Sequence, residues 1–534
     1  MTEQLVAQDA TSAPPGRSPV VRHAAFGAAA LLVVLLLRFS SQGVPDPDSF
    51  YHYRHAALYA EKGLLVSAFP WLPYSILSRF ASDIGYGFHV FLIPFTYLRD
   101  PILGIKLAAV AETVIVMLIL YAVLRRHRCA YTLAWPFVLL FLAPPIIWTV
   151  FQTRPQTLTM GFSALLVSAM LIGSAPGAFV AAFATGFVHL NIIPIVPALV
   201  VITAVVKGLI ERRWEWQTWA AALAGAVAGW ALRPNQLGAA RLEWVQIAVH
   251  EVVRQKGIPL LFGREWSPVA LPALGSFACF ITIWVGMSAV LLIAIATSRH
   301  SLSRSDRAFL WSSLVLSVLF FVGAVAVTKR ATPFWATFAV MFVAKAFTCF
   351  LDPGDQRPGQ LLRGDARIIS AAFVAVLAAA MVWTGISEHM IQGKWRGIPP
   401  DRLKAASLWL KDHGRPGDVV YNANWDMFPE LFFWNQDDRY VSGLDPIFLY
   451  AYDERLYWKA HHLQTGEATD RTWGTMGYPA GSEEDTYTVL RRDFKASAVV
   501  LEMARNAGLY QYLRSDRRFV LAFQDATYAV FTLK

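Results

Sequence analysis

Two carboxylates stand two residues apart directly after the first long apolar run of the chain. Asp46 and Asp48 precede a stretch of aromatic residues that ends at Arg54. Charged groups at a membrane surface are costly unless they are paired or used. A carboxylate here can take a proton from an acceptor hydroxyl or amide, or hold a divalent cation beside a phosphate. Asp48 could equally cap the helix that we expect to follow it.

The composition places these residues in a polytopic membrane protein. Of 534 residues, 56% are hydrophobic and only 16% are charged, whereas a soluble domain carries about 25% charged residues. Continuous apolar runs, each able to cross a hydrocarbon layer of about 30 Å, predict about eleven to thirteen transmembrane helices. The alternating strands of an outer-membrane barrel are not seen. Eleven runs are evident, at 24–39, 102–124, 131–150, 157–173, 177–193, 194–210, 217–232, 271–297, 308–328, 333–350 and 368–386.

Basic residues predict the orientation. Excess Lys and Arg mark cytoplasmic loops, which accounts for most of the net charge of +10 and argues against a nucleic-acid partner. With an odd number of spans, the N-terminus is then cytoplasmic and the C-terminal region extracytoplasmic, as expected of a multi-pass plasma (inner) membrane protein. The four clusters are Arg125/Arg126/Arg128, Lys207/Arg212/Arg213, Arg299/Arg304/Arg307 and Arg357/Arg363/Arg367.

Hydropathy divides the chain into three parts. Residues 1–22 are polar and predict a disordered cytoplasmic tail, and residues 23–386 form the transmembrane domain. Residues 387–534 predict a soluble extracytoplasmic α/β domain. The elements expected there are a helix over 402–411, strands beginning near 418 and 498, and a closing hairpin over 519–533.

The segment from Asp48 to Arg54, Asp-Ser-Phe-Tyr-His-Tyr-Arg, resembles a motif of a known family. Oligosaccharyltransferase catalytic subunits, which belong to the GT-C class of membrane glycosyltransferases, carry Asp-x-x-x-x-Tyr-Arg in their first outer loop. The resemblance implies that Asp48 is the main catalytic carboxylate, that Asp46 assists it, and that Arg54 belongs to the substrate site. Two facing carboxylates raise the pKa of one of them, which suits a general base.

Two later segments resemble the same family. Glu265, three residues before Pro268, is similar to a Glu that assists at the active site, although it could instead form a solvated pair with Arg264. Arg330, preceded by Lys329, is similar to an Arg that grips the phosphate of the lipid carrier, for which a planar guanidinium is suited. The alternative is that this basic pair snorkels to lipid headgroups.

The acceptor-binding motif of the family is only partly present. Trp425 and Asp426 match the centre of its Trp-Trp-Asp-Tyr-Gly sequence, but Asn424 replaces the first Trp and Met-Phe replaces Tyr-Gly. Recognition of an asparagine sequon is therefore in doubt. Trp425 and Asp426 could face another acceptor, or simply pack and cap.

The metal-binding motif is also incomplete. Arg154 is similar to the Arg of a Ser-Arg-Ser segment in the family, but the acidic residues that follow in the family are missing here. A divalent cation, Mg or Mn, would have only Asp48 and Glu265 as ligands, which is an incomplete site for a hard cation. Metal dependence is left open.

Several other polar residues allow two interpretations. Within the apolar runs, Glu112, His189 and Asn191 could serve a site or pair across helices. Asp445 fits a turn but could face the active site. The loop 233–264 suits an amphipathic helix on the membrane surface, where it would bind headgroups or guide an anionic lipid.

These patterns predict a glycosyltransferase. It would move a sugar or glycan from a polyprenyl-(di)phosphate carrier to a protein, glycan or lipid acceptor on the extracytoplasmic face. The rival interpretation is a lipid or solute transporter, or a flippase, with an accessory outer domain. A transporter predicts charges near the middle of the membrane and internal repeats, whereas here the charges gather at one face and no repeat is evident.

Overall fold

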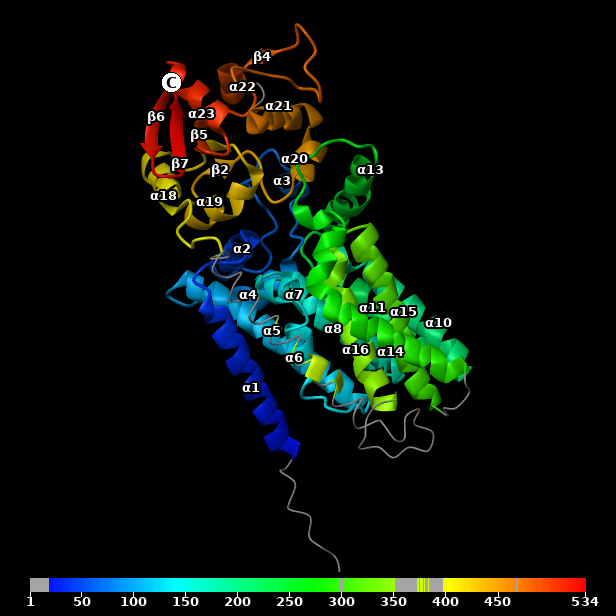
Figure 1. The fold of residues 1–534 in the computed structure, drawn as a ribbon. Coiled ribbons are helices and arrows are strands. Elements are labelled where there is room, and N and C mark those ends of the chain that lie inside the picture. The colour runs from blue at the N-terminus through cyan, green and yellow to red at the C-terminus, as the bar shows by residue number, and fades with distance from the viewer. Residues whose placement is uncertain are drawn as a thin grey trace, which may run out of the picture.

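A computed structural model describes residues 19–296, 302–350, 397–466 and 469–534, together with a few positions between 372 and 383. A bundle of helices forms one half of the molecule, and the C-terminal α/β domain stands at one end of it (Figure 1). The expected tail, 1–22, lies outside the described residues except for 19–22, with which the first helix begins. Most of the expected span 368–386 lies outside them, and its described positions are helical.

Five helical segments of the described chain are long and apolar enough to cross a membrane. The most buried is α16, in which every residue is packed inside the bundle, as expected for a helix that is apolar all round. These segments make the chain a multi-pass membrane protein. They contain α1 (Pro19–Ser40), α5 (Pro101–Arg126), α14 (Ala278–Ala296), α15 (Arg304–Ala326) and α16 (Thr332–Phe350).

Four other expected spans form shorter helices of 14 to 17 residues. The expected span 131–150 is broken in two, because Pro144 and Pro145 have no N–H to continue a helix and instead begin a new one. The four helices are α8 (Pro155–Leu171), α9 (Ala175–Val188), α10 (Ile195–Glu211) and α11 (Trp216–Ala231), and the two pieces are α6 (Trp135–Leu140) and α7 (Pro144–Phe151).

Helices α9 and α11 cross at very short range. A Cβ built on Gly225 would lie 2.2 Å from the carbonyl oxygen of Phe179, and one on Gly229 would lie 2.5 Å from that of Phe183. Small residues at such a crossing let two backbones approach closely, which is how helices in a membrane gain packing energy.

The two long loops, residues 41–100 after α1 and 232–270 after α11, are largely helical. The first contains α2 (Asp48–Lys62), α3 (Ile76–Phe80) and α4 (Tyr86–Thr96). The second contains α12 (Gln236–Trp244), a π-helical turn (Val245–Val249) and α13 (His250–Gln255), and α13 stands at the level of the C-terminal domain (Figure 1). Arg233 of this second loop is buried and donates to four backbone carbonyls, so it does not bind lipid.

The C-terminal domain has a mixed five-stranded sheet in the order β2-β1-β5-β7-β6. β1 is parallel to β2 and β5, and β7 is antiparallel to β5 and β6, so the expected α/β domain and its closing hairpin are confirmed. The strands are β1 (Val419–Asn422), β2 (Arg439–Tyr440), β3 (Arg471–Thr472), β4 (Glu484–Asp485), β5 (Ala496–Glu502), β6 (Phe519–Gln524) and β7 (Tyr528–Leu533). The helices are α18 (Lys404–His413), α19 (Phe428–Trp434), α20 (Pro446–Tyr452), α21 (Glu454–Thr465), α22 (Thr486–Arg492) and α23 (Ala507–Ser515).

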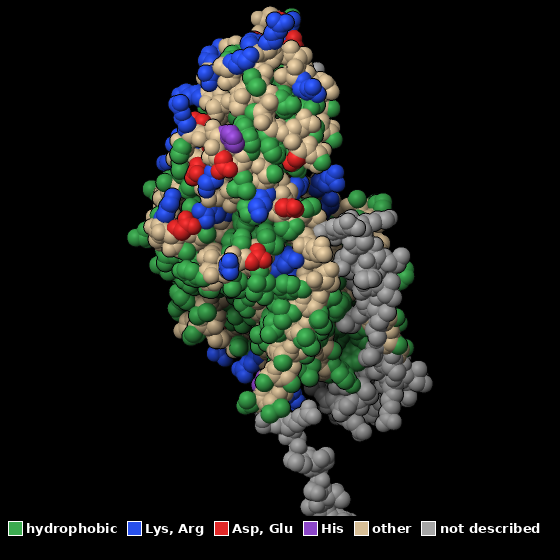
Figure 2. Space-filling view, turned by 90° about the vertical axis from the view of Figure 1, so that its left-hand side faces the viewer, with side chains coloured by type: hydrophobic (Ala, Val, Ile, Leu, Met, Phe, Trp, Pro, Cys, Tyr) green, Lys and Arg blue, Asp and Glu red, His purple; other side chains and the backbone are tan. Residues whose placement is uncertain are grey.

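The first of these loops, 41–100, packs on the C-terminal domain in two hydrophobic clusters. The ring of Phe50 on α2 lies 5.1 Å from that of Phe433 on α19. The indole of Trp71 donates to the carbonyl of Gln436 at 2.8 Å, and the amide of Tyr440 donates to the carbonyl of Trp71 at 2.7 Å. On the face seen in Figure 2, hydrophobic side chains dominate the bundle half and charged ones gather over the other half.

Candidate active site

Arg154 draws together three of the expected site carboxylates. It precedes Pro155 at the start of α8 and is extended, as a residue before proline prefers. Its guanidinium contacts Asp46 through Nε and, at 2.8 Å, through Nη2, and Nη2 also donates to Asp48 at 2.6 Å. Nη1 lies 3.7 Å from Glu265. Segments far apart in the sequence therefore meet at one cation.

Asp48 is the first residue of α2 rather than its cap. Pro47 occupies the N-cap position, and no side chain caps the helix. A carboxylate in the first turn interacts favourably with the helix dipole. The hydroxyl of Ser49 accepts the amide of Thr153 at 3.2 Å, which ties the start of α2 to the segment that carries Arg154.

Burial raises the pKa of both aspartates. It is the largest influence on Asp48, whose pKa rises to about 7 although Arg154 lowers it. The pKa of Asp46 is also raised by burial and lowered by Arg154. A carboxyl whose pKa lies near neutrality can take up a proton and release it again, which is what a general base must do.

Glu265 has the opposite electrostatic setting. Burial disfavours its charge, but Arg154 and Arg330 together bring the pKa of Glu265 down to about 2. Arg330 Nη2 donates to Glu265 at 3.0 Å. The expected alternative, a solvated pair with Arg264, is wrong, because Glu265 lies between two other arginines.

The guanidinium of Arg330 is stacked on an aromatic ring, and one of its nitrogens has no hydrogen-bond partner in the described chain. Its guanidinium carbon lies 3.8 Å from the ring centroid of Trp266. Its Nε is buried and has no hydrogen-bond partner among the described residues. Thr328 holds the turn, since its hydroxyl accepts the amide of Arg330 and donates to the carbonyl of Glu265. An unpaired N–H on a fixed cation is suited to bind an anion.

The C-terminal domain contributes Asp445 to the same region. Asp445 caps α20 by accepting the amide of Ile447 at 3.0 Å. Its side chain is hydrogen-bonded to Trp266, and its pKa rises to about 7, chiefly through burial. Asp445 therefore agrees with both interpretations, because it caps a helix at a turn and also lies near Arg330.

Two expected site residues, Arg54 and Lys329, form no ion pair with the carboxylates around Arg154 in the described chain. Arg54 pairs with Glu61 at 2.8 Å on α2, and none of its contacts reaches the carboxylates around Arg154. The backbone amide of Lys329 donates to Ser267 at 2.9 Å, and its side chain forms no ion pair in the described ranges.

Trp425 and Asp426 lie at the edge of the C-terminal domain. The indole of Trp425 donates to the carbonyl of Leu261 at 3.0 Å, four residues before Glu265. Asp426 pairs with Arg505 at 2.8 Å and does not cap a helix. The pair thus borders the loop that carries Glu265, without touching the carboxylates around Arg154.

The polar residues of the expected spans, Asn191, His189 and Glu112, differ in whether their side chains have hydrogen-bond partners. Asn191 donates to Gln246, so it pairs across elements. His189 Nδ1 and both carboxyl oxygens of Glu112 are buried without a side-chain partner in the described chain.

Sequence reasoning missed four residues next to the site, of which three are buried and His52 is partly exposed. His52 and His55 on α2 meet Asp83 and His89 from the segment at the start of α4. The only signal was His52 inside the motif from Asp48 to Arg54 and His55 directly after it, and nothing in the sequence marked the partners of these histidines.

A divalent cation fits the expected ligands poorly. Asp48 and Glu265 both face Arg154, which already supplies positive charge where the cation would have to bind. Mg and similar ions take six or more oxygen ligands, and Asp46 is likewise engaged by the guanidinium. No catalytic step is therefore derived through a metal.

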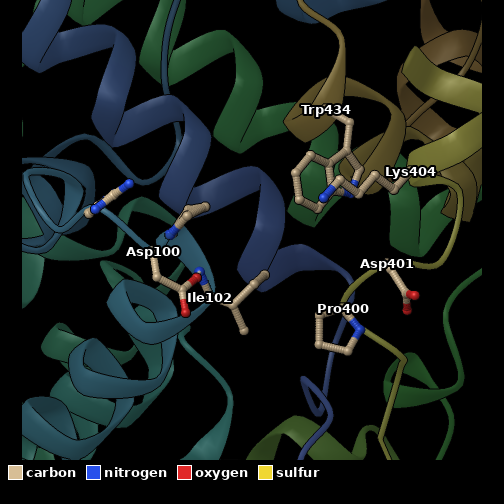
Figure 3. Close-up of a pocket in the computed structure, with 8 residues that line it drawn as sticks. Asp100, Ile102, Pro400, Asp401, Lys404 and Trp434 are labelled. Atoms are coloured by element: carbon tan, nitrogen blue, oxygen red, sulfur yellow. The ribbon is translucent and has the colours of Figure 1, made fainter. Parts of the chain in front are cut away.

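A separate cavity of about 490 Å³ opens between the start of α5 and the C-terminal domain (Figure 3). Lys404 lies over the ring of Trp434 at 4.6 Å. No expected site residue lines this cavity. Its wall consists of Arg99, Asp100, Pro101, Ile102, Pro400, Asp401, Lys404 and Trp434.

Comparison with known proteins finds no matching family model and no matching curated protein. Solved structures do match. ArnT from Cupriavidus metallidurans in the apo state has a TM-score of 0.55 and 13% identity, over 96% of this chain and 98% of that chain. The same protein bound to undecaprenyl phosphate has a TM-score of 0.53 and 14% identity, over 96% and 97%. The arabinofuranosyltransferase AftD from Mycobacteria has a TM-score of 0.56 and 15% identity, over 95% of this chain and 40% of that chain.

Proposed function

Because the chain has the fold of the GT-C superfamily of membrane glycosyltransferases, we propose that it transfers a sugar or glycan from a polyprenyl-linked phosphate or diphosphate to an acceptor on the extracytoplasmic face. The observation that carries the proposal is the line of charges Asp48, Arg154, Glu265 and Arg330. The structure of ArnT with undecaprenyl phosphate supports a carrier of this chemistry.

Asp48 is the base in this proposal. Its raised pKa lets it accept the proton of an acceptor hydroxyl or amide as the acceptor attacks the anomeric carbon of the sugar. The bond between that carbon and the phosphate oxygen breaks, and its electron pair stays on the phosphate. A single displacement of this kind inverts the anomeric carbon. Asp46 and Arg154 set the charge around the base.

Arg330 binds the phosphate. Its Nε–H is unpaired and lies on the same edge of the guanidinium as Nη2, which donates to Glu265, so Nε is free to donate to a phosphate oxygen beside that ion pair. Negative charge grows on the departing phosphate, so a fixed cation stabilises the transition state more than the ground state. Glu265 orients both arginines. Lys329 adds positive charge that attracts the phosphate of the carrier. Arg54 lies on α2 at the edge of the proposed site.

Trp425 and Asp426 are assigned to the acceptor side. They lie on the C-terminal domain, and the indole of Trp425 is bonded to the loop that carries Glu265. An acceptor held there could reach Asp48 while the lipid carrier stays in the membrane. The topology fits this arrangement if the N-terminus is cytoplasmic and the C-terminal domain extracytoplasmic.

The test is sugar transfer by purified protein. Radiolabelled polyprenyl-phosphate sugars are offered with cell-envelope acceptors to the wild type and to Asp48→Asn, and the loss of the base should cost about 1,000-fold in kcat. Exposed Asp412→Asn is the matched control and should transfer normally. Undetectable transfer by the wild type, or transfer unchanged in both Asp48→Asn and Asp46→Asn, would refute the proposal.

The phosphate role of Arg330 has its own pair of variants. Arg330→Ala should lower kcat/KM for the donor by about 100-fold. Arg330→Lys keeps the charge but loses the planar fork, so it should fall between Ala and the wild type. Equal activity of Ala and the wild type would remove Arg330 from the site.

A further inference from the structure

A chain of hydrogen bonds runs from a buried carboxylate to the helix that carries Asp48. His89 Nδ1 lies 2.6 Å from Asp83 Oδ2, and His89 Nε2 lies 2.8 Å from His52 Nδ1. His52 follows Asp48 by four residues in α2, so the two side chains lie on one face of the helix.

Asp83 fixes the direction of this chain. Its carboxylate accepts the hydroxyl of Tyr59 at 2.8 Å and the amide of Gly85 at 2.9 Å, besides the bond from His89. Burial opposes its charge, but His89 and His55 hold the pKa of Asp83 well below its usual range. An ionised carboxylate only accepts, so His89 must donate through Nδ1.

The tautomers of both histidines follow from that direction once His89 is neutral, and its neutrality is part of the inference that is tested below. A neutral His89 that donates through Nδ1 has a lone pair on Nε2, and this lone pair accepts the N–H of His52 Nδ1. His52 Nε2 is then left without a hydrogen. In water the Nε2–H tautomer is favoured for histidine, so the buried chain selects the less common form.

The free nitrogen of His52 borders the carboxylate site. His52 is partly exposed, whereas Tyr51 and Tyr53 on either side of it are buried. Burial, with a smaller contribution from the charge of Arg154, holds the pKa of His52 well below its usual range. Since Nδ1 faces His89, Nε2 faces the other way, and it has no hydrogen-bond partner among the described residues.

We propose that His52 binds a substrate hydroxyl by accepting its hydrogen bond at Nε2 and holds that hydroxyl beside Asp48. His89 and Asp83 are positioning residues that keep this nitrogen unprotonated. A neutral acceptor can orient a hydroxyl without adding positive charge beside Arg154. The hydroxyl-bearing substrate rests on the proposed function, whereas the tautomer of His52 does not.

A metal ion shared by this cluster is disfavoured by ring geometry. His55, Asp83 and His89 bring ligand atoms within 4.8 Å of one another. The rings of His55 and His89, however, are stacked, with centroids 4.3 Å apart and an interplanar angle of 18°. The lone pair of an imidazole lies in the plane of its ring, so two nearly parallel rings cannot direct theirs at one ion.

The tautomers are measured by nitrogen NMR of full-length protein labelled with ¹⁵N-histidine. The difference between wild type and His52→Gln assigns the signals of His52, which should show a protonated Nδ1 and an unprotonated Nε2 at neutral pH. Asp83→Asn should disturb this pattern, and Asp412→Asn should not. A His52 that is charged, or protonated on Nε2, overturns the relay.

The substrate role is tested with two amides in place of His52. Gln places an amide oxygen near the position of Nε2, whereas Asn reaches only the position of Nδ1. His52→Asn should therefore lose about 10-fold more in kcat/KM than His52→Gln, the worth of one hydrogen bond. Equal losses, or a greater loss for Gln, overturn hydroxyl binding.

The two measurements separate the possible failures. If the wild type transfers no sugar, the proposed function fails and hydroxyl binding fails with it, while the tautomers still decide whether the relay exists. If transfer is normal but His52 has the common tautomer, only the inference on His52 is overturned.

Discussion

Asp48→Asn should make the protein more stable at high pH while it removes the base. The pKa of Asp48 rises from 3.8 to about 7 on folding, because burial disfavours the charged form. The folded state thus binds more protons than the unfolded state between these values, and stability is lost as the pH rises through that window. At 1.36 kcal/mol per pH unit, the cost of keeping Asp48 charged reaches about 4 kcal/mol above pH 7 and about 2 kcal/mol at pH 5.

The variant has no such cost, so its advantage must grow with pH. With about 2.1 cal/mol/K of unfolding entropy per residue, a chain of 534 residues changes its Tm by about 1 °C per kcal/mol. The Tm of Asp48→Asn minus that of the wild type should therefore increase by about 2 °C between pH 5 and pH 8.

The assay is thermal unfolding of the purified protein, followed by tryptophan fluorescence at both pH values. Asp412→Asn, on the surface of the C-terminal domain, is the control and should show no pH-dependent difference from the wild type. A constant or shrinking difference for Asp48→Asn would show that the folded protein does not disfavour the charge, and the assignment of Asp48 as a base would lose its physical ground.

Three further outcomes are expected. If Asp48 is the base, the rate of transfer should rise with pH to a plateau above about pH 7, measured with saturating donor. Arg154→Gln leaves buried carboxylates without a counterion and should cost about 3–5 kcal/mol by thermal unfolding, and Asp46→Asn in the same chain should restore part of the loss. Gly225→Ala places a Cβ 2.2 Å from a backbone oxygen and should cost about 1–3 kcal/mol. Gly286→Ala, which meets open space on α14, should cost nothing measurable.

The fold was predictable wherever one local pattern governs a segment. The closing hairpin and the strand at 496–502 follow from short runs of alternating or β-branched residues, and they appear as β5, β6 and β7. The break at Pro144 was visible in the sequence, but a hydropathy window averages over it. Helices α2 and α3 were harder to predict, because part of their apolar surface packs on the C-terminal domain, which is far away in the sequence.

The site also has parts that a local pattern reveals and parts that it does not. Asp48 could be found because a short motif surrounds it, and Arg330 because a basic pair stands at the outer end of a span. Their connections could not be found, since Arg154 lies 108 residues from Asp46, and Glu265 lies 65 residues from Arg330. Pairings over such separations depend on the complete helix packing. Asp83 and His89 belong to no motif at all, and only their burial beside α2 gives them a role.

The packing of α2 also bears on the choice between transfer and transport. A transporter must expose one site to both sides of the membrane in turn. Here α2, which carries Asp48 and His52, is tied to the C-terminal domain by Phe50 against Phe433, and the loop that follows it is bonded to the same domain through Trp71. Turning the carboxylates toward the other side would break this packing. A site fixed at one face, with the base, the phosphate-binding arginine and the neutral hydroxyl acceptor that we propose, can instead receive a lipid from the membrane and an acceptor from the aqueous side without moving.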